Sequence, residues 1–493
     1  MTPLDMNKIA FLLLIFSLSF TASGQIKLSL VDVIDLAKEQ SPSAKAAETR
    51  KKNLYWQYRS FKSDYNPSLN LTGNLPGYNR DFFQVSQDDG TFAYRSREQL
   101  SSSLNLGLIQ PIAATGGEIS INSNLNQFND LNANSTTINP IYNTTLFNIQ
   151  LVQPVFGFNQ LKWDKRTEPL RYEESKRSYV EEMEFISLQS TNLYFDYMDA
   201  QINLQIAEFN LANNDTIFNI EQGRYNIGTT SKDKLLQVEL QLLRSKQDVA
   251  QANLDLQTSR LALRRYIGVQ DSTASKLELL LPEELPEFSI ALDKALAYAK
   301  RNRADYIEFE RRRAEADRDV ASARARRFQS NLVASFGLNN AAGDLPQTYN
   351  SPNDQQRVNL TLSVPILDWG RSKSRVQTAL ANQELTQYTL DQEIQNFEQE
   401  IITLVSRMDV IRLQVEITKK SDEVAQERYE VAQNRYLIGK IDITNLNIAL
   451  TEKDNARRSY IGALRSFWAA YFDLRRLTLY DFMNDELLYQ ELD

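Results

Sequence analysis

The sequence predicts a mixed α/β membrane protein built by tandem duplication, in which long helices flank a set of transmembrane strands. Three observations carry this prediction. The chain matches itself when it is shifted by 211 positions, segments 157–226 and 370–438 have helical periodicity with almost no glycine or proline, and shorter segments alternate apolar with neutral polar residues.

The first 24 residues predict an export signal. They hold Lys8, an apolar run from Ile9 to Phe20, and small residues before Gln25. The run is shorter than the ~20 residues that a spanning helix needs. We therefore favour cleavage near Ala22 to Gly24, with an uncleaved membrane anchor as the alternative, and no later segment is long and apolar enough to be a membrane helix.

The self-match divides the chain into two repeats. Residues 25–280 form the first repeat, 290–493 the second, and 281–289, with two prolines, the linker. Upstream of the strands the shift changes from 211 to 262, so the first repeat holds 51 extra residues. Within these, the stretch 104–112 is similar to 147–155, which suggests a copied strand unit.

Three helices are predicted in each repeat. Their ranges are 29–66, 157–226 and 231–267 in the first repeat, and 290–328, 370–438 and 442–476 in the second. Apolar residues recur every three or four positions, as at Ile401, Leu404 and Met408, which is typical of coiled-coil packing. A helix as long as 370–438 measures roughly 100 Å at 1.5 Å per residue. The two shorter helices of a repeat, placed end to end, match the length of the long helix. Their junction and the linker are therefore expected near the middle of the long helix.

Strands are predicted over about 67–156 and about 330–366. Leu104, Leu106 and Leu108 illustrate the pattern, with polar residues such as Asn105 between them. A half-buried sheet of a soluble protein has the same alternation, but the export signal favours a transmembrane barrel with a wet lumen. One chain offers four to six strands, too few for a lumen, and open edges cannot face lipid. Several copies must therefore share one barrel.

Composition excludes several classes of function. The chain has no histidine and no cysteine, so it cannot form a Ser-His-Asp triad, a thiolate zinc site, a disulfide or a lipid-anchored cysteine at its mature N-terminus. The formal net charge of −8 argues against nucleic acid as a partner. We predict no enzyme, cofactor or metal site. A carboxylate-based hydrolase using Glu181 and Glu182 is the remaining alternative, although adjacent acids on a helix do not face each other.

One turn occurs twice, as RYNIGTTSKDKLL at 224–236 and RYLIGKIDITNLN at 435–447. Gly228 and Gly439 suit left-handed helix ends, and Ser231 and Asp442 suit helix starts. The motif therefore predicts a tight helix reversal. That purpose explains the glycines and caps, whereas Arg224, Tyr225, Arg435 and Tyr436 are candidates for a function at the turn.

These features together resemble the TolC-like outer-membrane efflux proteins. The resemblance rests on the signal, the long helices, the paired turns, and the strand-to-helix motifs QPVFG and VPILDWGRSKSRV. The junction residues concerned are Pro154, Trp163, Pro365, Trp369 and Gly370. The resemblance implies a homotrimer with one outer-membrane barrel, a periplasmic helical tube closed at its tip, and a periplasmic adaptor and inner-membrane pump as partners. The extra residues would then add a hairpin, giving six strands per chain instead of four, or form a flap.

The resemblance also implies that tyrosine and arginine at the turn hold the periplasmic entrance shut. Tyr436 matches the family's tyrosine, but Asn445 and Ile448 occupy the positions of its acidic ring, with Asp233 and Asp442 nearby. The expected function is a passive exit duct of a tripartite efflux or type I secretion system. A soluble periplasmic coiled-coil adaptor or scaffold is the alternative. Drugs, metal ions, siderophores and proteins all remain open as cargo.

Overall fold

The computed structural model describes residues 26–131, 140–269, 277–282 and 285–489. The predicted export signal lies outside the described residues, as do 283–284 of the predicted linker. The chain divides into two compact units, each made of discontinuous segments. The first comprises Met1–Lys51, Lys176–Arg303 and Asn396–Asp493, and the second comprises Lys52–Ser175 and Ala304–Gln395. The combination of long helices with a β domain confirms the predicted mixed α/β class.

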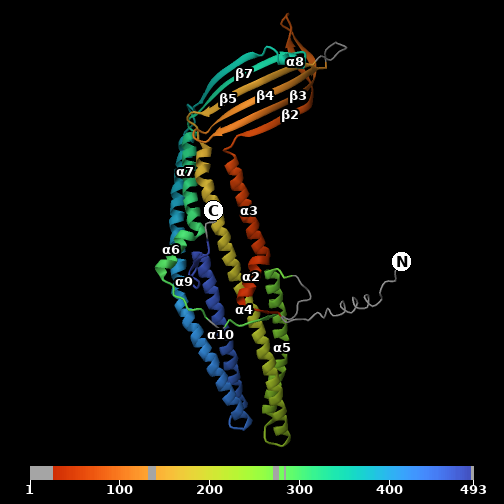
Figure 1. The fold of residues 1–493 in the computed structure, drawn as a ribbon. Coiled ribbons are helices and arrows are strands. Elements are labelled where there is room, and N and C mark those ends of the chain that lie inside the picture. The colour runs from red at the N-terminus through yellow and green to blue at the C-terminus, as the bar shows by residue number, and fades with distance from the viewer. Residues whose placement is uncertain (1–25, 132–139, 270–276, 283–284, 490–493) are drawn as a thin grey trace, which may run out of the picture. The chain divides into compact units, whose positions relative to one another are not determined.

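The second unit contains one antiparallel sheet of six strands (Figure 1). Its order is β2 (Ser68–Ser86), β3 (Phe92–Ile112), β4 (Gly117–Asp130), β5 (Ile141–Pro154), β7 (Gln329–Ala342) and β8 (Asn353–Ser363). The short helix α8 (Leu345–Thr348), which the sequence did not predict, lies between β7 and β8. Six strands is the number expected if the 51 extra residues add a hairpin. In the single chain β2 and β8 are the two edges of the sheet.

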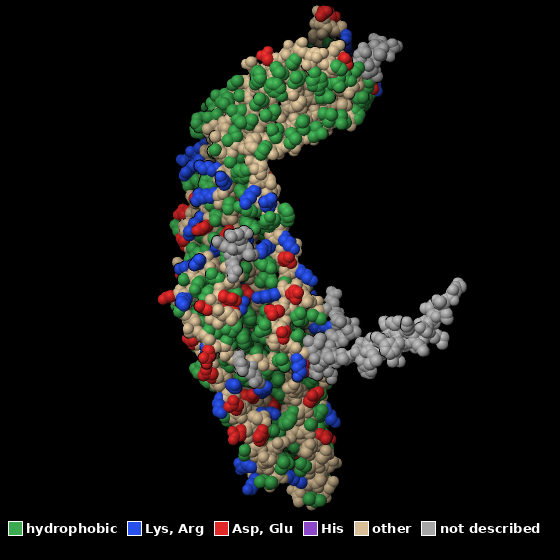
Figure 2. All heavy atoms as spheres, in the orientation of Figure 1, with side chains coloured by type: hydrophobic (Ala, Val, Ile, Leu, Met, Phe, Trp, Pro, Cys, Tyr) green, Lys and Arg blue, Asp and Glu red, His purple; other side chains and the backbone are tan. Residues whose placement is uncertain are grey.

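Register places the apolar residues of neighbouring strands on one face. Leu104 pairs with Leu125, Ile149 with Phe336, and Leu332 with Leu360. Because side chains alternate between faces along a strand, these pairs continue across the sheet as one apolar surface. Figure 2 shows this surface open to the outside.

The hairpin of β2 and β3 is longer than its neighbours. Pairing between β3 and β4 begins at Gln99 with Asp130, so the part of the hairpin around residues 79–98 continues as a two-stranded ribbon. Asp81 and Arg97 form an ion pair across this ribbon, and Arg97 also lies over the Phe83 ring at 5.3 Å. The next pair, Arg80 opposite Glu98, points to the other face, so both faces of the ribbon carry charge among its aromatic residues.

The first helix of each repeat is broken, which corrects two predictions of continuous helices. The range 29–66 contains α2 (Leu30–Gln40) and α3 (Pro42–Ser63), and 290–328 contains α6 (Leu292–Asn302) and α7 (Ala304–Ala325). At the first break the extended Ser41 precedes Pro42, which disfavours a helical residue before it. Arg303 is extended at the second break without a proline, at the position 262 residues after Ser41.

Four further helices complete the fold: α4 (Gln160–Asn226), α5 (Lys232–Ile267), α9 (Arg371–Leu437) and α10 (Ile443–Thr478). Pro169 is accommodated inside α4, because it lies close to the start of that helix. In the first unit, α4 and α5 form one helical hairpin and α9 and α10 form another, with both turns at the same end (Figure 1). No helix in the described ranges is both long enough and apolar enough to span a membrane.

A buried ionic network in the first unit was missed by the sequence analysis. Glu184 of α4 pairs with Lys38 of α2 at 2.8 Å and with Arg475 of α10 at 2.8 Å. Arg475 also pairs with Asp481, which accepts a hydrogen bond from the Tyr471 hydroxyl. Asp481 belongs to β9 (Tyr480–Asp481), which pairs with β10 (Glu486–Leu487). A second small sheet pairs β1 (Ile26–Leu28) with β6 (Leu277–Leu279) in parallel.

Candidate functional site at the paired helical turns

The two RYxIG turns have the same backbone geometry. Gly228 has φ 75° and Gly439 has φ 73°, in the left-handed region that side chains disfavour. The amide of Thr229 donates to the Arg224 carbonyl, and the amide of Lys440 donates to the Arg435 carbonyl. This is the hydrogen-bond pattern that ends a helix at a left-handed glycine. The repeated sequence thus gives two matching reversals.

Each following helix begins at a capping side chain. Ser231 accepts a hydrogen bond from the Lys234 amide, and Asp442 accepts one from the Asn445 amide at 2.9 Å. The Asn445 side chain also donates to Asp442 at 2.8 Å, so Asn445 is engaged in the helix cap. Asp233 lies in the first turn of α5, where its charge favours the helix start.

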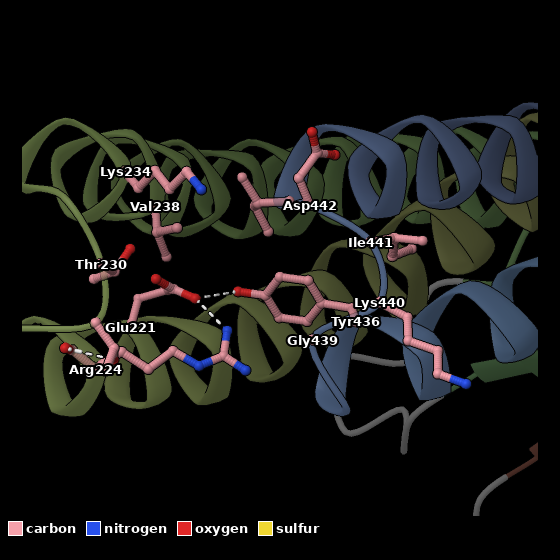
Figure 3. Close-up of a pocket in the computed structure, with 12 residues that line it drawn as sticks. Glu221, Arg224, Thr230, Lys234, Val238, Tyr436, Gly439, Lys440, Ile441 and Asp442 are labelled. Carbon is pink, nitrogen blue, oxygen red and sulfur yellow. Dashed lines mark hydrogen bonds and ion pairs between the residues drawn. The ribbon is translucent and has the colours of Figure 1, made fainter.

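Three side chains join the two hairpins, as Figure 3 shows. The Tyr436 hydroxyl at the end of α9 donates to the Glu221 carboxylate of α4 at 2.8 Å. Arg224, one turn after Glu221, donates to the same oxygen at 2.7 Å. The Arg224 guanidinium also lies 5.5 Å from the centre of the Tyr436 ring. We call Glu221, Arg224 and Tyr436 the latch.

Glu221 and Tyr436 are buried and Arg224 is half-buried, so the polar groups of the latch depend on one another. Tyr436 is 3% exposed and packs in an apolar cluster with Ile217, Val238 and Leu446. Burial disfavours ionisation of Glu221, but hydrogen bonds from Tyr436 and Arg224 outweigh it and hold the pKa of this carboxyl below its ordinary value. Burial first, and then the Glu221 carboxylate, raise the pKa of Tyr436, which therefore stays a donor.

A hollow of about 510 Å³ adjoins the latch. Its lining combines the three latch residues with Lys234, Lys440 and Asp442 from the turns and helix starts. Figure 3 shows Glu221 and Tyr436, which both line this hollow, pointing toward each other from opposite hairpins and in direct contact. The two hairpins are thus joined by the polar contacts of the latch, which lie beside this hollow and adjoin the apolar cluster around Tyr436.

The structure separates the predicted turn residues into two groups. Arg224 and Tyr436 come together, although they belong to different repeats. Tyr225 is 40% exposed, and Arg435 is exposed as well. The repeat-related residues Tyr225 and Tyr436 therefore have different surroundings.

Glu221 was missed by the sequence analysis. The position 211 residues later is Ala432, but residues 217–220 also differ from their counterparts 428–431, so the comparison of the repeats does not single out Glu221.

The predicted strand-to-helix junctions lie in the second unit. Pro154 ends β5, and its carbonyl accepts a hydrogen bond from the side-chain Nε2 of Gln153. Trp163 lies in the first turn of α4 beneath the Arg166 guanidinium. Pro365 follows β8, and Trp369 and Gly370 both have positive φ. Asp368 fixes this second junction by accepting hydrogen bonds from the amides of Gly370 and Ser372.

Long paired helices, a β domain and two matching helical turns together define the class of outer-membrane channels with a helical periplasmic part. Consistent with this, the family model described as outer membrane efflux protein matches residues 33–269 and 295–478. The chain belongs to this family, whose members are outer-membrane channels and not enzymes.

Two curated relatives match part of the chain. The cation efflux system protein CusC from Escherichia coli is 26% identical over 216 residues, and the probable outer membrane lipoprotein SilC from Salmonella typhimurium is 23% identical over 227 residues. These matches cover 42% and 45% of this chain, and 45% and 48% of the relatives. The chain thus spans about half the length of the curated relatives it matches.

Solved structures share the fold over most of the chain. The Campylobacter jejuni CmeC outer membrane channel superposes with a TM-score of 0.67 at 15% identity, covering 94% of this chain and 87% of that one. The open state of the Neisseria gonorrhoeae MtrE outer membrane channel gives 0.60 at 17% identity, covering 91% and 88%. Both likenesses concern the fold.

Proposed function

We propose that this protein is the passive outer-membrane exit duct of a multi-component export system. The observation that carries the proposal is the six-stranded sheet, which has an exposed apolar face and two open edges. On the edge strand β8, Val358, Leu360 and Leu362 are 74%, 67% and 65% exposed. Such an apolar face is suited to contact with lipid. The open edges of the sheet, however, cannot remain in lipid, because their backbone groups would lack hydrogen-bond partners.

Closure of the sheet requires further copies of the chain. We propose a homotrimer in which β8 of each copy pairs with β2 of the next, giving one barrel of 3 × 6 strands, or eighteen. Barrels of about 16–18 strands are wide enough for an aqueous channel. The neutral polar residues on the inner face, such as Asn105 and Asn359, suit a wet lumen. The shared spacing of 211 residues supports an origin by tandem duplication.

The latch is proposed to hold the periplasmic end closed. It joins the two hairpins of one copy at their turns, where six hairpins from three copies would surround the pore. Opening must then separate Tyr436 from Glu221. A periplasmic adaptor and an inner-membrane pump would supply the energy, in keeping with the name of CusC as part of a cation efflux system.

Detergent extraction and planar-bilayer recording test this function together. We expect the mature chain to need detergent, to form trimers, and to conduct in bilayers. An image of the assembly should count eighteen strands, whereas twelve would contradict the added hairpin. A chain that stays soluble without detergent would favour the periplasmic scaffold instead.

A further inference from the structure

Six basic side chains gather where the second unit's helices meet the sheet. Only one acidic residue, Asp368, occurs in the segments 320–330 and 364–383 that carry them. The basic residues are Arg324, Arg326 and Arg327 around the end of α7, and Arg371, Lys373 and Arg375 at the start of α9. Apart from the half-buried Arg327, all are exposed.

The sheet brings these two groups together. Gln329 at the start of β7 pairs with Ser363 at the end of β8, so the end of α7 and the start of α9 lie at the same end of the same strand pair. Figure 2 shows Lys and Arg side chains gathered directly beside the hydrophobic face of the sheet. The positive charge therefore begins where the apolar surface ends.

An exposed apolar loop lies within this basic group. Ile366 is 99% exposed and Trp369 is 91% exposed, and Leu367 and Phe328 are also exposed. The loop is held in place, since Asp368 binds the amides of Gly370 and Ser372 while Trp369 keeps φ at 54°. A fixed loop that presents tryptophan and isoleucine to the outside suits an interface between hydrocarbon and water.

The matching loop of the first repeat is partly covered. There the Asn159 side chain donates to the Ala113 carbonyl of the β3–β4 turn, and Val155, the counterpart of Ile366, is 46% exposed. The second loop follows the edge strand β8, and among the described residues no strand lies beyond it. A second copy docked there would bring Arg59 and Lys62 near the end of its α3, with only Asp64 as an acid. Positive charges of the two copies would then lie close together, so an anionic partner is needed to neutralise the basic residues.

We propose that the six basic residues and the loop 364–370 form an anchor that binds the phosphate headgroups of anionic phospholipids in the periplasmic leaflet of the outer membrane. The loop residues Ile366 and Trp369 enter the interfacial layer, and the arginines contact phosphates. Each Lys or Arg close to an anionic leaflet contributes about fivefold in binding. The proposal rests on the outer-membrane location and not on the export function.

Lipid retention by the reconstituted full-length protein tests this anchor. The protein is placed in nanodiscs of phosphatidylethanolamine and phosphatidylglycerol, re-extracted mildly, and its retained lipid is measured by native mass spectrometry. We expect the wild type to be enriched in phosphatidylglycerol, and R324Q/R371Q/R375Q to lower that enrichment at least about tenfold. The control K232Q/K246Q/K419Q removes three exposed charges from other helical segments and should retain the wild-type enrichment.

A second readout locates the loop. Phosphatidylglycerol brominated on its acyl chains should quench part of the wild-type tryptophan fluorescence, and W369F should lose that part. Unchanged lipid retention in the arginine variant would overturn the proposal. The proposal would also fail if that variant changed ion selectivity or lost its trimers while its lipid retention stayed intact. Conductance in pure phosphatidylethanolamine bilayers is measured alongside, because it tests the export function separately.

Discussion

Replacing Tyr436 by phenylalanine should weaken the closed state of the periplasmic end. The variant keeps the ring in its apolar cluster and removes only the hydroxyl that donates to Glu221 at 2.8 Å. A hydrogen bond to a charged group contributes about 1.5–3 kcal/mol, which corresponds to roughly a 10- to 150-fold shift in an equilibrium. Arg224 still neutralises Glu221 in the variant, so we expect the lower end of that range for each copy.

Single-channel recording in planar bilayers measures the shift as the fraction of time spent in high-conductance states. Tyr225→Phe is the matched control, because Tyr225 occupies the repeat-related position but is exposed. Because each of the three copies carries the substitution, we expect a rise of at least about tenfold for Tyr436→Phe and none for the control. If both variants behave like the wild type while retaining their helical content by circular dichroism, the latch does not hold the channel closed. Combining Tyr436→Phe with Arg224→Ser should add to the effect, whereas combining it with the exposed Arg435→Ser should not.

Three further outcomes follow from the described contacts. The pKa of Glu221 lies below its ordinary 4.5, and the pKa of Tyr436 lies above its ordinary 10.0. The stabilisation of the closed state by the latch should therefore be constant between pH 4.5 and pH 10.0. It should be lost as pH falls further below this range and lost again as pH rises further above it, which conductance measured against pH would show. Asp442→Ala should lower the free energy of unfolding by about 1 kcal/mol through loss of its helix cap, and Asp233→Ala by less, as measured by denaturant titration. Glu184→Ala should lower the free energy of unfolding by about 3–5 kcal/mol, because Arg475 and Lys38 lose their shared buried partner. A melting temperature equal to that of the wild type would contradict this prediction.

Local rules explain how far the fold could be predicted from the sequence. Alternating apolar residues indicated the strands, and steps of three and four indicated the helices, because each pattern reflects a single repeating geometry. The break at Arg303 could not be found in this way, since no proline marks it and only its spacing of 262 from Ser41 relates the two breaks. The small sheet of β1 and β6 escaped because three-residue strands carry too little pattern.

The site was predictable to a smaller extent. The glycines and caps of the turns follow from backbone conformation, so Gly228, Gly439 and Asp442 could be identified. Which polar side chains meet depends on the packing of α4 against α9, and this distinguishes Tyr436 from Tyr225. Glu221 differs from its counterpart Ala432, but a single sequence does not say which partner an unmatched acid will choose.

The two sheet edges make unassembled copies hazardous. Residues 358–363 of β8 carry no charge and no proline, so this half of the edge is an open template for pairing with any extended chain. On the opposite edge, β2 is interrupted by an irregularity between Asn74 and Gly77, which contains Pro76. Mispairing and aggregation in the periplasm should therefore start at β8. A chaperone that escorts this chain to the membrane would have to cover that half-strand until another copy does.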